Sequence, residues 1–363
     1  MKTVVVLSGK GGTGKTSVTA SLADLEVQGG RRIVLADTDV DASNLHLLLQ
    51  PSAEEEHQYV GGQVAEVILE RCLGHGECAA HCRFHAIALA RISHTLPAVA
   101  ADAPAGTAFV AAAPPGSKHH ADRRLRALAT EVREKYGLED DDGAIKAHID
   151  PTLCEGCAVC TVVCPEGAIN MHDQVAGTWR RGNTRLGPLV DARLSPGGEN
   201  SGKLVTRVRQ AALVEAERIG ADLLLMDGPP GVGCPVIAAV TGTDMVVAVT
   251  EPTPPALSDL ERLVSLARHF NVPVAVVINK ADLNPHRAEA FERRLTASAI
   301  EVLGRIPYDE AVPQALQKGI LPVDAGGGFA RAFAEVHQRF RQRLAALSGP
   351  PQPTLLQIES LGL

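Results

Sequence analysis

The stretch Gly9-Lys10-Gly11-Gly12-Thr13-Gly14-Lys15-Thr16 constrains the fold of this chain more than any other. It follows the apolar run 4–7 and precedes the helical stretch 17–26, which indicates a strand, a loop and a helix in that order. Glycines let consecutive backbone N–H groups turn toward a ligand without a Cβ clash, and the helix N-terminus adds partial positive charge. The stretch therefore predicts a phosphate-binding loop, in which Lys15 reaches the β- and γ-phosphates and the Thr16 hydroxyl holds Mg²⁺.

The same glycines also fit a dinucleotide-binding fingerprint. Gly9, Gly11 and Gly14 have its spacing, and Asp37 follows at a distance suited to binding a ribose. That interpretation leaves Lys15 and Thr16 unexplained, whereas the loop of a nucleoside triphosphatase requires both. We therefore expect a nucleoside triphosphate rather than a nicotinamide or flavin cofactor.

Composition argues against several classes of function. The net charge of −7 gives no overall attraction to nucleic acid, and 3% aromatic residues offer no surface for base stacking. No apolar run approaches membrane-spanning length, and Met1 leads straight into the first predicted strand without a signal peptide. We expect a cytoplasmic protein, in which clustered cysteines indicate metal rather than disulfides.

Carboxylates follow two further predicted strands. The strand 32–36 ends at Asp37-Thr38-Asp39, and Asp41 follows as a second carboxylate or as a helix cap. The strand 223–226 ends at Asp227, which opens a loop containing Gly231. Carboxylates at strand ends beside a phosphate loop are where Mg²⁺ and the attacking water are organised. Asp227 and its loop thus indicate a Walker B carboxylate and a switch that senses the γ-phosphate.

The early lysine identifies the class of phosphate loop. Lys-Gly-Gly-x-Gly-Lys-Thr, which begins at Lys10, is similar to the deviant Walker A loop of the MinD/ParA/nitrogenase-iron-protein class. The resemblance implies an α/β fold with a mostly parallel sheet, ATP hydrolysis, and a homodimer in which Lys10 reaches the partner's nucleotide. By the same resemblance Asp39 orients the water and Asn279 contacts the base. Asn279-Lys280-Ala281-Asp282 also matches the guanine-reading motif of GTPases, but Lys10 favours ATP.

A second kind of motif lies in the middle of the chain. Cys154, Cys157, Cys160 and Cys164 have the spacing of a bacterial ferredoxin, and Pro165 follows the last of them as that pattern requires. In the pattern three thiolates bind one [4Fe–4S] cluster and the fourth crosses to another. Structural zinc is the alternative, but zinc sites usually show separated cysteine pairs.

An earlier run repeats this pattern imperfectly. Cys72, Cys78 and Cys82 keep the spacing, while His75 replaces a cysteine and Arg83 replaces the proline. With crossed ligation, one cluster takes Cys72, Cys78 and Cys164, and the other takes Cys154, Cys157, Cys160 and Cys82. Three outcomes stay open for the first cluster: a [4Fe–4S] cluster with His75 as its fourth ligand, a [3Fe–4S] cluster, or none.

These motifs predict a chain of several parts. We expect a first part of the ATPase domain at 1–60, an inserted α+β ferredoxin-like domain at 61–172, a second ATPase part at 173–345 and a flexible tail at 346–363. Within the insert, 92–148 is longer than a ferredoxin requires, with a loop at 97–116 and a basic helix at 121–136. That helix is either a docking surface for an acidic partner or a solvated face. The tail has no Lys or Arg, which argues against a membrane anchor.

Up to about residue 345 the chain resembles MinD-superfamily P-loop ATPases that carry an inserted ferredoxin domain. The resemblance implies a dimer that couples ATP hydrolysis to electron transfer toward a redox partner. The alternatives are an assembly or carrier ATPase for iron–sulfur clusters or metallocofactors, and a positioning ATPase with a structural cluster. Cys234 is the one cysteine outside the insert. It is either a small buried thiol or, as in the nitrogenase iron protein, a ligand of a cluster shared across the dimer axis.

Overall fold

The computed structural model describes residues 1–91, 145–195 and 201–347, which form two compact units. The first, here called the sheet unit, comprises Met1–Tyr59 and the residues from Ala176 onward; the second, the cysteine unit, is Val60–Val175. The expected loop at 97–116, the basic helix at 121–136 and the tail from 348 lie outside the described residues.

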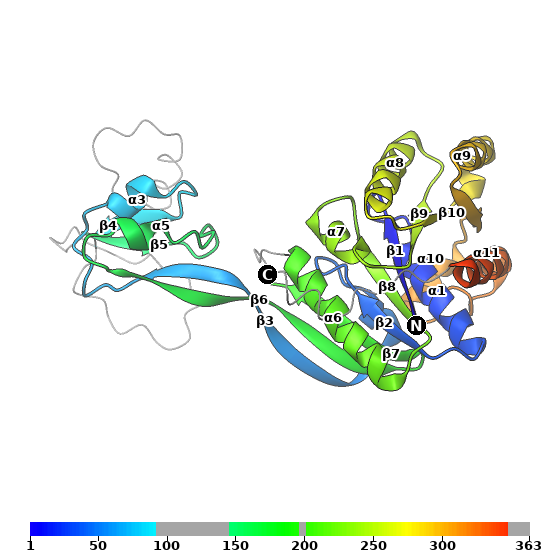
Figure 1. The fold of residues 1–363 in the computed structure, drawn as a ribbon, viewed down its shortest axis with the longest axis horizontal. Coiled ribbons are helices and arrows are strands. Elements are labelled where there is room, and N and C mark those ends of the chain that lie inside the picture. The colour runs from blue at the N-terminus through cyan, green and yellow to red at the C-terminus, as the bar shows by residue number, and fades with distance from the viewer. Residues whose placement is uncertain (92–144, 196–200, 348–363) are drawn as a thin grey trace. The chain divides into compact units, whose positions relative to one another are not determined.

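A nine-stranded sheet organises the sheet unit (Figure 1). Its strands are β1 (Lys2–Ser8), β2 (Ile33–Asp37), β3 (Ser52–Val67), β6 (Ile169–Thr184), β7 (Gly187–Leu194), β8 (Leu223–Pro230), β9 (Met245–Thr250), β10 (Val274–Ile278) and β11 (Glu301–Arg305). Their spatial order is β11-β10-β9-β1-β8-β2-β7-β6-β3. The pairs from β11 to β7 are parallel, and β6 adds to β7 in the antiparallel direction. The predicted α/β fold with a mostly parallel sheet is confirmed.

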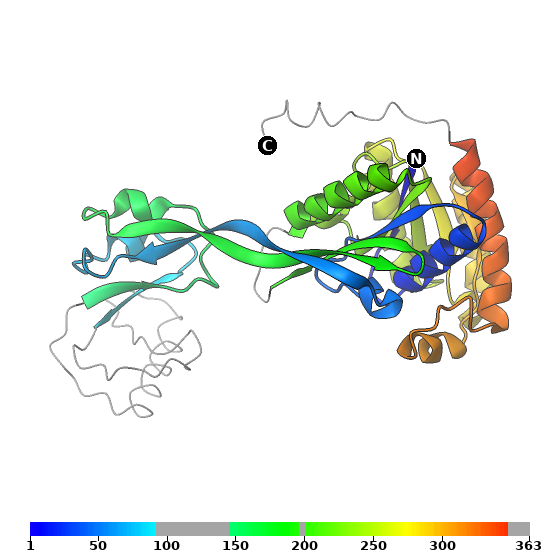
Figure 2. The same ribbon diagram turned by 90° about the horizontal axis from the view of Figure 1, so that it is seen from below.

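Helices cover both faces of this sheet (Figure 2). Because side chains alternate along a strand, Val5 and Leu7 of β1 enter one core while Val4 and Val6 enter the other. The first core is closed by α6 (Ser201–Ile219), α7 (Cys234–Val240), α8 (Pro254–His269) and α9 (Pro285–Ala297), the last preceded by the short η1 (Ala281–Leu283). The second is closed by α1 (Lys15–Gln28), α2 (Leu45–Leu49), α10 (Ala311–Gln317) and α11 (Gly327–Ala346). Strands buried on both faces explain the continuous apolar runs in the sequence.

The cysteine unit is smaller and is built from two similar halves. It contains α3 (Glu77–His81), α5 (Val159–Val163) and an antiparallel pair of strands, β4 (Ile87–Arg91) and β5 (Ile145–Ile149), together with portions of β3 and β6. β5 overlaps the end of the segment 92–148, beyond the expected loop at 97–116 and basic helix at 121–136, and no strand was predicted there. Ala147 and Ile149 alternate inward, and β5 pairs with β4.

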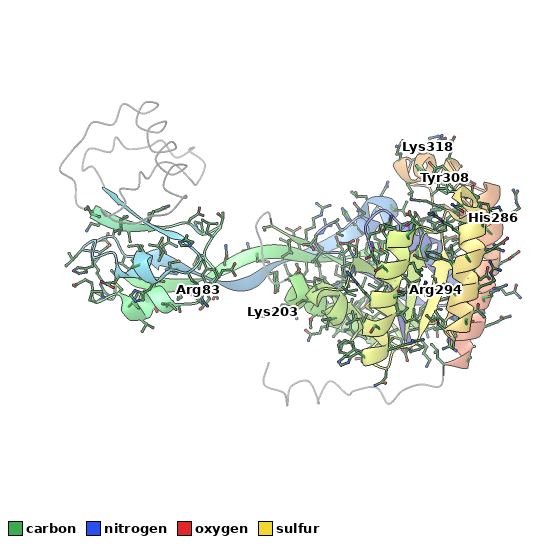
Figure 3. All side chains as sticks on the ribbon, turned by 90° about the horizontal axis from the view of Figure 1, so that it is seen from above. Arg83, Lys203, His286, Arg294, Tyr308 and Lys318 are labelled. Carbon is green, nitrogen blue, oxygen red and sulfur yellow. The ribbon has the colours of Figure 1, made fainter. Side chains whose placement is uncertain are left out.

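The two halves repeat one backbone design. A residue with positive φ precedes each helix, Gly76 (φ 84°) before α3 and Ala158 (φ 59°) before α5. Each helix ends at a cysteine with extended backbone, Cys82 and Cys164. Arg83, where the second half has Pro165, is exposed (Figure 3). The internal repeat seen in the sequence therefore extends to the backbone conformation.

Candidate functional site

The glycine-rich loop joins β1 to α1 at the carboxyl end of β1. Gly12 and Gly14 have φ of 77° and 93°, which L-residues with side chains rarely adopt. A Cβ on Gly9 would come within 2.1 Å of the Asp259 Cβ, and one on Gly14 within 2.5 Å of the Asn279 Nδ2. Gly11 has open space around the position of a Cβ. Sterics therefore require glycine at particular positions of the loop, as a close backbone wrap around phosphate would.

Lys15 and Thr16 open α1 and face the Asp227 and Asp39 carboxylates. The Thr16 hydroxyl donates to Asp227 Oδ2 over 2.6 Å, and the Thr19 hydroxyl donates to Oδ1 over 3.0 Å. The Lys15 Nζ lies 3.7 Å from Asp39 Oδ2 and is largely buried. The structure thus brings together the lysine, the hydroxyl and both carboxylates that the sequence singled out. Thr19 was missed, although its place one helical turn after Lys15 was a readable signal.

The carboxylates of Asp37 and Asp227 lie deep in the sheet. Asp37 stands opposite Asp227 in the register between β2 and β8, and both are buried. Burial and the neighbouring Asp227 charge raise the pKa of Asp37 to about 8. Burial also raises the pKa of Asp227 to about 6, against the hydrogen bonds from Thr16 and Thr19. A divalent cation beside such groups would favour their charged forms, so this donor set fits Mg²⁺.

Asp37 has a second role that sequence reasoning gave to Asp41. Its Oδ2 accepts hydrogen bonds from the backbone N–H groups of Asn44 and Leu45 at the start of α2, and from the Ser43 hydroxyl. Asp41 is exposed. The expectation that Asp41 caps this helix is therefore wrong, because Asp37 supplies the acceptor from inside the sheet.

Lys10 is held within its own chain. Its Nζ lies 2.9 Å from Glu251 Oε2, and the Lys280 Nζ lies 2.6 Å from the other oxygen, Oε1. Burial raises the pKa of Glu251, but hydrogen bonds from Lys280 and Lys10 outweigh it and leave that pKa below its usual value. Lys280 also donates to the Gly12 carbonyl over 3.2 Å. The Lys10 side chain remains 42% exposed, so it is paired yet free to reach outward.

The remaining predicted residues of this site lie around the same loop. The Asn279 Nδ2 donates to the Thr13 carbonyl over 2.8 Å, which ties the end of β10 to the loop. The Gly231 N–H donates to the Ser8 carbonyl over 2.9 Å, and its φ is 91°. Among the described residues, the Thr13 hydroxyl is buried without a hydrogen-bond partner, as expected of a loop shaped around a polar ligand. The residues that the sequence predicts to bind the nucleotide therefore lie in or beside the glycine-rich loop.

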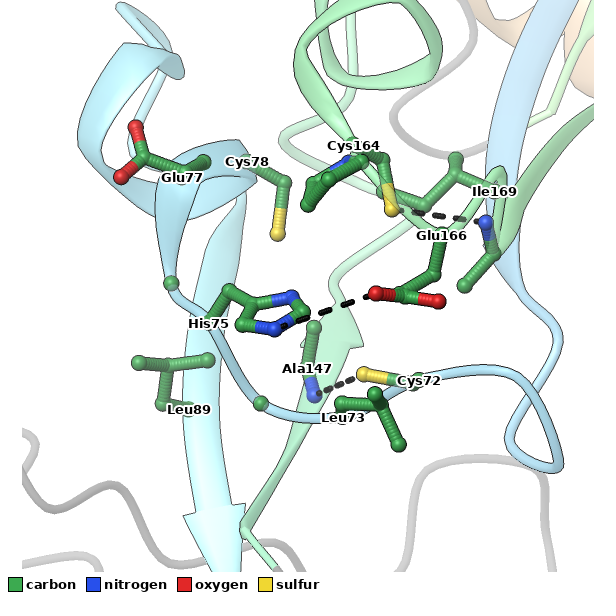
Figure 4. A pocket seen from close by; sticks show the side chains of 14 residues that line it. Cys72, Leu73, His75, Glu77, Cys78, Leu89, Ala147, Cys164, Glu166 and Ile169 are labelled. Carbon is green, nitrogen blue, oxygen red and sulfur yellow. Dashed lines mark hydrogen bonds and ion pairs between the residues drawn. The ribbon is translucent and has the colours of Figure 1, made fainter.

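The cysteines of the other unit line two cavities. The first is lined by Cys72, Cys78 and Cys164, with His75 and Glu166 beside them (Figure 4). Cys82, Cys154, Cys157 and Cys160 line the second. Each cavity opens to solvent and spans about 340 Å³, including the open solvent at its mouth. The first half of the repeat thus contributes one cysteine to the second cavity, and the second half contributes one to the first.

Backbone amides point at the sulfurs in both cavities. Ala147 and Ala168 donate N–H bonds to the sulfurs of Cys72 and Cys164, over 3.3 and 3.4 Å. Ala65 donates to Cys154 over 3.5 Å. Amide donors stabilise thiolates and set the potential of iron–sulfur clusters, so these surroundings fit such a group. Within residues 1–91, 145–195 and 201–347, no three His, Cys, Asp or Glu side chains form a site for a single metal ion.

Cys234 belongs to the sheet unit rather than to the cysteine unit. It is exposed at the beginning of α7, so the expectation of a small buried thiol is wrong. The helix starts there because Pro235 occupies its first turn, and a Cβ on Gly202 of α6 would lie 3.4 Å from the Cys234 Cβ. The thiol is thus held at the surface of the sheet unit.

Fold and site together define a P-loop ATPase of the MinD/ParA type. The CobQ/CobB/MinD/ParA nucleotide binding domain family matches residues 4–323, and the chain belongs to this family. An uncharacterized protein of Methanocaldococcus jannaschii is 26% identical over 339 residues, which cover 93% of this chain and 96% of that protein. An iron-sulfur cluster carrier protein of Pyrococcus abyssi is 29% identical over 162 residues, covering 41% of this chain and 55% of the carrier.

A solved structure is more distant. The septum site-determining protein MinD of Pyrococcus horikoshii, complexed with Mg-ADP, aligns with 96% of this chain and 99% of its own at 14% identity and a TM-score of 0.49. Among the described helices, none combines the length and the apolar character that crossing a bilayer requires.

Proposed function

We propose that this chain is a cytoplasmic ATPase that carries iron–sulfur clusters and delivers them to acceptor proteins. The observation that carries the proposal is the crosswise arrangement of cysteines, in which each half of the repeat supplies one thiol to the other half's cavity. Crossed ligation of this kind belongs to two-cluster ferredoxins, so we assign a ferredoxin-type role to the cysteine unit. The carrier relatives, similar over part of this chain, support delivery rather than storage.

The ligand sets follow from the two cavities. Cys154, Cys157, Cys160 and Cys82 would hold one [4Fe–4S] cluster. Cys72, Cys78 and Cys164 would hold a second, either [4Fe–4S] with His75 or [3Fe–4S]. Such clusters supply one-electron chemistry or transferable iron and sulfide. In the nucleotide site, Thr16 and Asp227 would hold Mg²⁺, which neutralises phosphate charge.

In this proposal, each residue of the nucleotide-binding site has its own role. Lys15 and the amides of the loop bind the β- and γ-phosphates, Asp39 orients the attacking water, and Asn279 contacts the base. Lys10 leaves Glu251 and reaches the nucleotide of a second copy, so hydrolysis requires a homodimer. The 42% exposure of the Lys10 side chain supports this step.

Electron transfer to a redox partner is a second candidate function. Helices α3 and α5, which carry Cys78 and Cys160, pack against each other, so the two cavities adjoin. Adjacent clusters suit electron passage from one to the other. A positioning ATPase with a structural cluster is a third candidate, and it requires no loss of iron during turnover.

One experiment separates these functions. The full chain is purified without oxygen, its iron and sulfide are counted, and EPR spectra are recorded with and without ATP. It is then mixed with an iron-free [2Fe–2S] or [4Fe–4S] ferredoxin under ATP turnover. A carrier loads the acceptor, and an electron carrier changes its EPR signal while keeping its iron. Protein without iron would contradict all three functions.

Cys234 adds a further possibility at the dimer level. As an exposed thiol on the sheet unit, it would meet its counterpart if a symmetric dimer forms over this surface. Two thiolates alone are too few for a cubane, so the bridged cluster would be transient and would need other ligands. Iron counted per dimer with a non-hydrolysable ATP analogue, in wild type against Cys234→Ser, tests this. Equal counts would exclude a bridging role.

A further inference from the structure

The two cavities differ at one corner. Cys72, His75 and Cys78 occupy the same places in the first half as Cys154, Cys157 and Cys160 occupy in the second. The backbone agrees, because Gly74 and Gly156, which precede His75 and Cys157, both have positive φ, 74° and 64°. His75 therefore stands where the repeat places a thiol.

The surroundings of His75 are fixed by the fold. A Cβ on Gly74 would come within 2.3 Å of the Ile145 carbonyl, so this loop lies tightly against β5. Lys146 of the same strand donates to the Cys72 carbonyl over 2.5 Å. Figure 4 shows the His75 ring lying toward the three sulfurs rather than away from them. The imidazole thus completes the lining of a cavity that already has three thiols.

Glu166 faces the same ring. Its Oε1 lies 3.9 Å from the His75 Nε2, and the two side chains are 39% and 43% exposed. By contrast, Cys72 and Cys78 in the same cavity are each 7% exposed. A carboxylate beside one ring nitrogen leaves the other nitrogen available to a metal, as is usual for metal-binding histidines. The fourth corner of this cavity is consequently its most solvent-accessible one.

We propose that this corner is an exchangeable ferrous-iron site, with His75 as the ligand and Glu166 as the carboxylate that orients it. This inference rests on the proposed function, since it requires a cluster in the first cavity. A [4Fe–4S]²⁺ core that loses Fe²⁺ becomes [3Fe–4S]⁰, with all four sulfides retained. No electron enters or leaves, and the imidazole returns to Glu166 as the iron departs. The second cavity, with four thiolates, keeps its iron.

Ligand chemistry gives the direction of the difference. Replacing a thiolate by a neutral imidazole removes one negative charge from the cluster's ligand set, which weakens electrostatic attraction for the fourth iron. Solvent exposure lets water and chelators reach that iron. The first cavity would therefore supply iron to an acceptor while the second remains intact during transfer.

The test measures ferrous iron captured by ferrozine from the anaerobically loaded full chain, without oxidant. Wild type should release about one iron of roughly eight quickly, since each [4Fe–4S] cluster holds about four. Subsequent one-electron oxidation by ferricyanide should then reveal the EPR signal of [3Fe–4S]⁺. Release of all the iron at one rate, or no fast release, would overturn the proposal. A chain that binds no iron would instead refute the proposed function.

Variants assign the fast iron to its ligands. His75→Cys should slow the fast phase at least about tenfold, and Glu166→Gln should accelerate it about tenfold, as loss of a carboxylate that orients a metal ligand does. Cys157→His should create a second fast iron in the other cavity. His81→Ala is the matched control, because His81 is an exposed histidine that binds the Glu77 carbonyl. An unchanged fast phase in both His75→Cys and Glu166→Gln would contradict the proposal.

Discussion

The nucleotide site and the cysteine cavities are organised in opposite ways. In the nucleotide site the charged side chains pair with one another, Lys15 with Asp39 and Lys10 with Glu251. In the cavities, Cys72, Cys154 and Cys164 each receive one backbone N–H bond. The first arrangement must exchange partners when phosphate and Mg²⁺ bind, whereas the second is a fixed frame of donors. Nucleotide binding can therefore alter the site's contacts, while a cluster would fit a frame already formed.

Removing Lys15 should have the largest effect on this comparison. Lys15→Ala removes the positive charge that would bind the β- and γ-phosphates, and it leaves the Asp39 carboxylate without its lysine partner. ATP hydrolysis should fall by at least about 100-fold, the usual loss when one preorganised transition-state contact is removed. Steady-state phosphate release measures it, with Lys318→Ala, an exposed lysine shown in Figure 3, as the control. Hydrolysis within twofold of wild type would show that the P-loop assignment is wrong.

Asp39→Asn should separate binding from chemistry. The amide keeps the size of the side chain but loses the charge that pairs with Lys15 and orients water. We expect hydrolysis to fall about 100-fold, within the range for loss of a positioned acid–base group, while ATP still binds and the dimer still forms. Equilibrium dialysis and size-exclusion chromatography with ATP check both points. Weaker ATP binding with an unchanged rate constant for hydrolysis would assign Asp39 to binding instead.

Lys10→Ala tests the exchange of partners directly. Because Lys10 pairs with Glu251 in one chain and would act on the partner's nucleotide, its loss should spare ATP binding but lower turnover about tenfold or more. Mixing this variant with Lys15→Ala should give mixed dimers with one complete site, and hence partial recovery of turnover. The dimer mechanism fails if Lys10→Ala hydrolyses ATP as fast as wild type does.

The buried carboxylates of Asp37 and Asp227 should make the stability of the folded chain depend on pH. The raised pKa values of Asp37 and Asp227 mean that the folded chain holds protons which the unfolded chain has lost above about pH 4. Their contribution to stability is therefore complete below pH 4 and disappears as pH rises through about 6 and about 8.

Denaturant unfolding from pH 6 to pH 8 measures this contribution as the difference between wild type and Asp37→Asn. That difference in unfolding free energy should move against wild type by at most about 1.4 kcal/mol per pH unit, the value for one full proton. Saturating Mg²⁺ and ADP should flatten the trend, because the cation favours the charged forms. A difference that is constant across this range would show that Asp37 is already charged at pH 6.

The smallest expected change concerns the amount of bound iron in two cysteine variants. Cys160→Ser removes one of the four thiols of the second cavity, so about half of the bound iron should be lost. Cys234→Ser is the matched variant outside both cavities and should retain its iron when no nucleotide is present. Iron and sulfide counts after anaerobic purification measure both. Equal losses in the two variants would contradict a fixed frame in the second cavity.

Sequence reasoning located the phosphate loop and Asp227 because local spacing specifies them. Buried parallel strands such as β1 and β8 can be recognised in the sequence as continuous apolar runs. The strand β3 gave no such signal, since Glu55, Glu56 and His57 follow one another with exposed side chains. A strand that is solvated on both faces has no apolar alternation to detect.

Contacts between distant segments were equally hard to predict. Glu251 meets both Lys10 and Lys280 only because β9 and β10 bring their carboxyl ends beside the loop. The crossed arrangement of cysteines was predictable because a repeated pattern implies it, whereas Glu166 beside His75 required the fold. Exposure of Cys234 likewise depends on where α7 begins.

The two strands shared by both units have a consequence for engineering this chain. β3 and β6 are neighbours at the edge of the sheet, and both continue into the cysteine unit. Ser52 contacts the Asn183 carbonyl, and further along Gln63 contacts Asp173, so the strands run in opposite directions. The chain thus leaves the sheet and re-enters it on adjacent strands, as in an elongated hairpin. A short turn joining β3 to β6 in place of the entire insert would leave the order of the other strands unchanged.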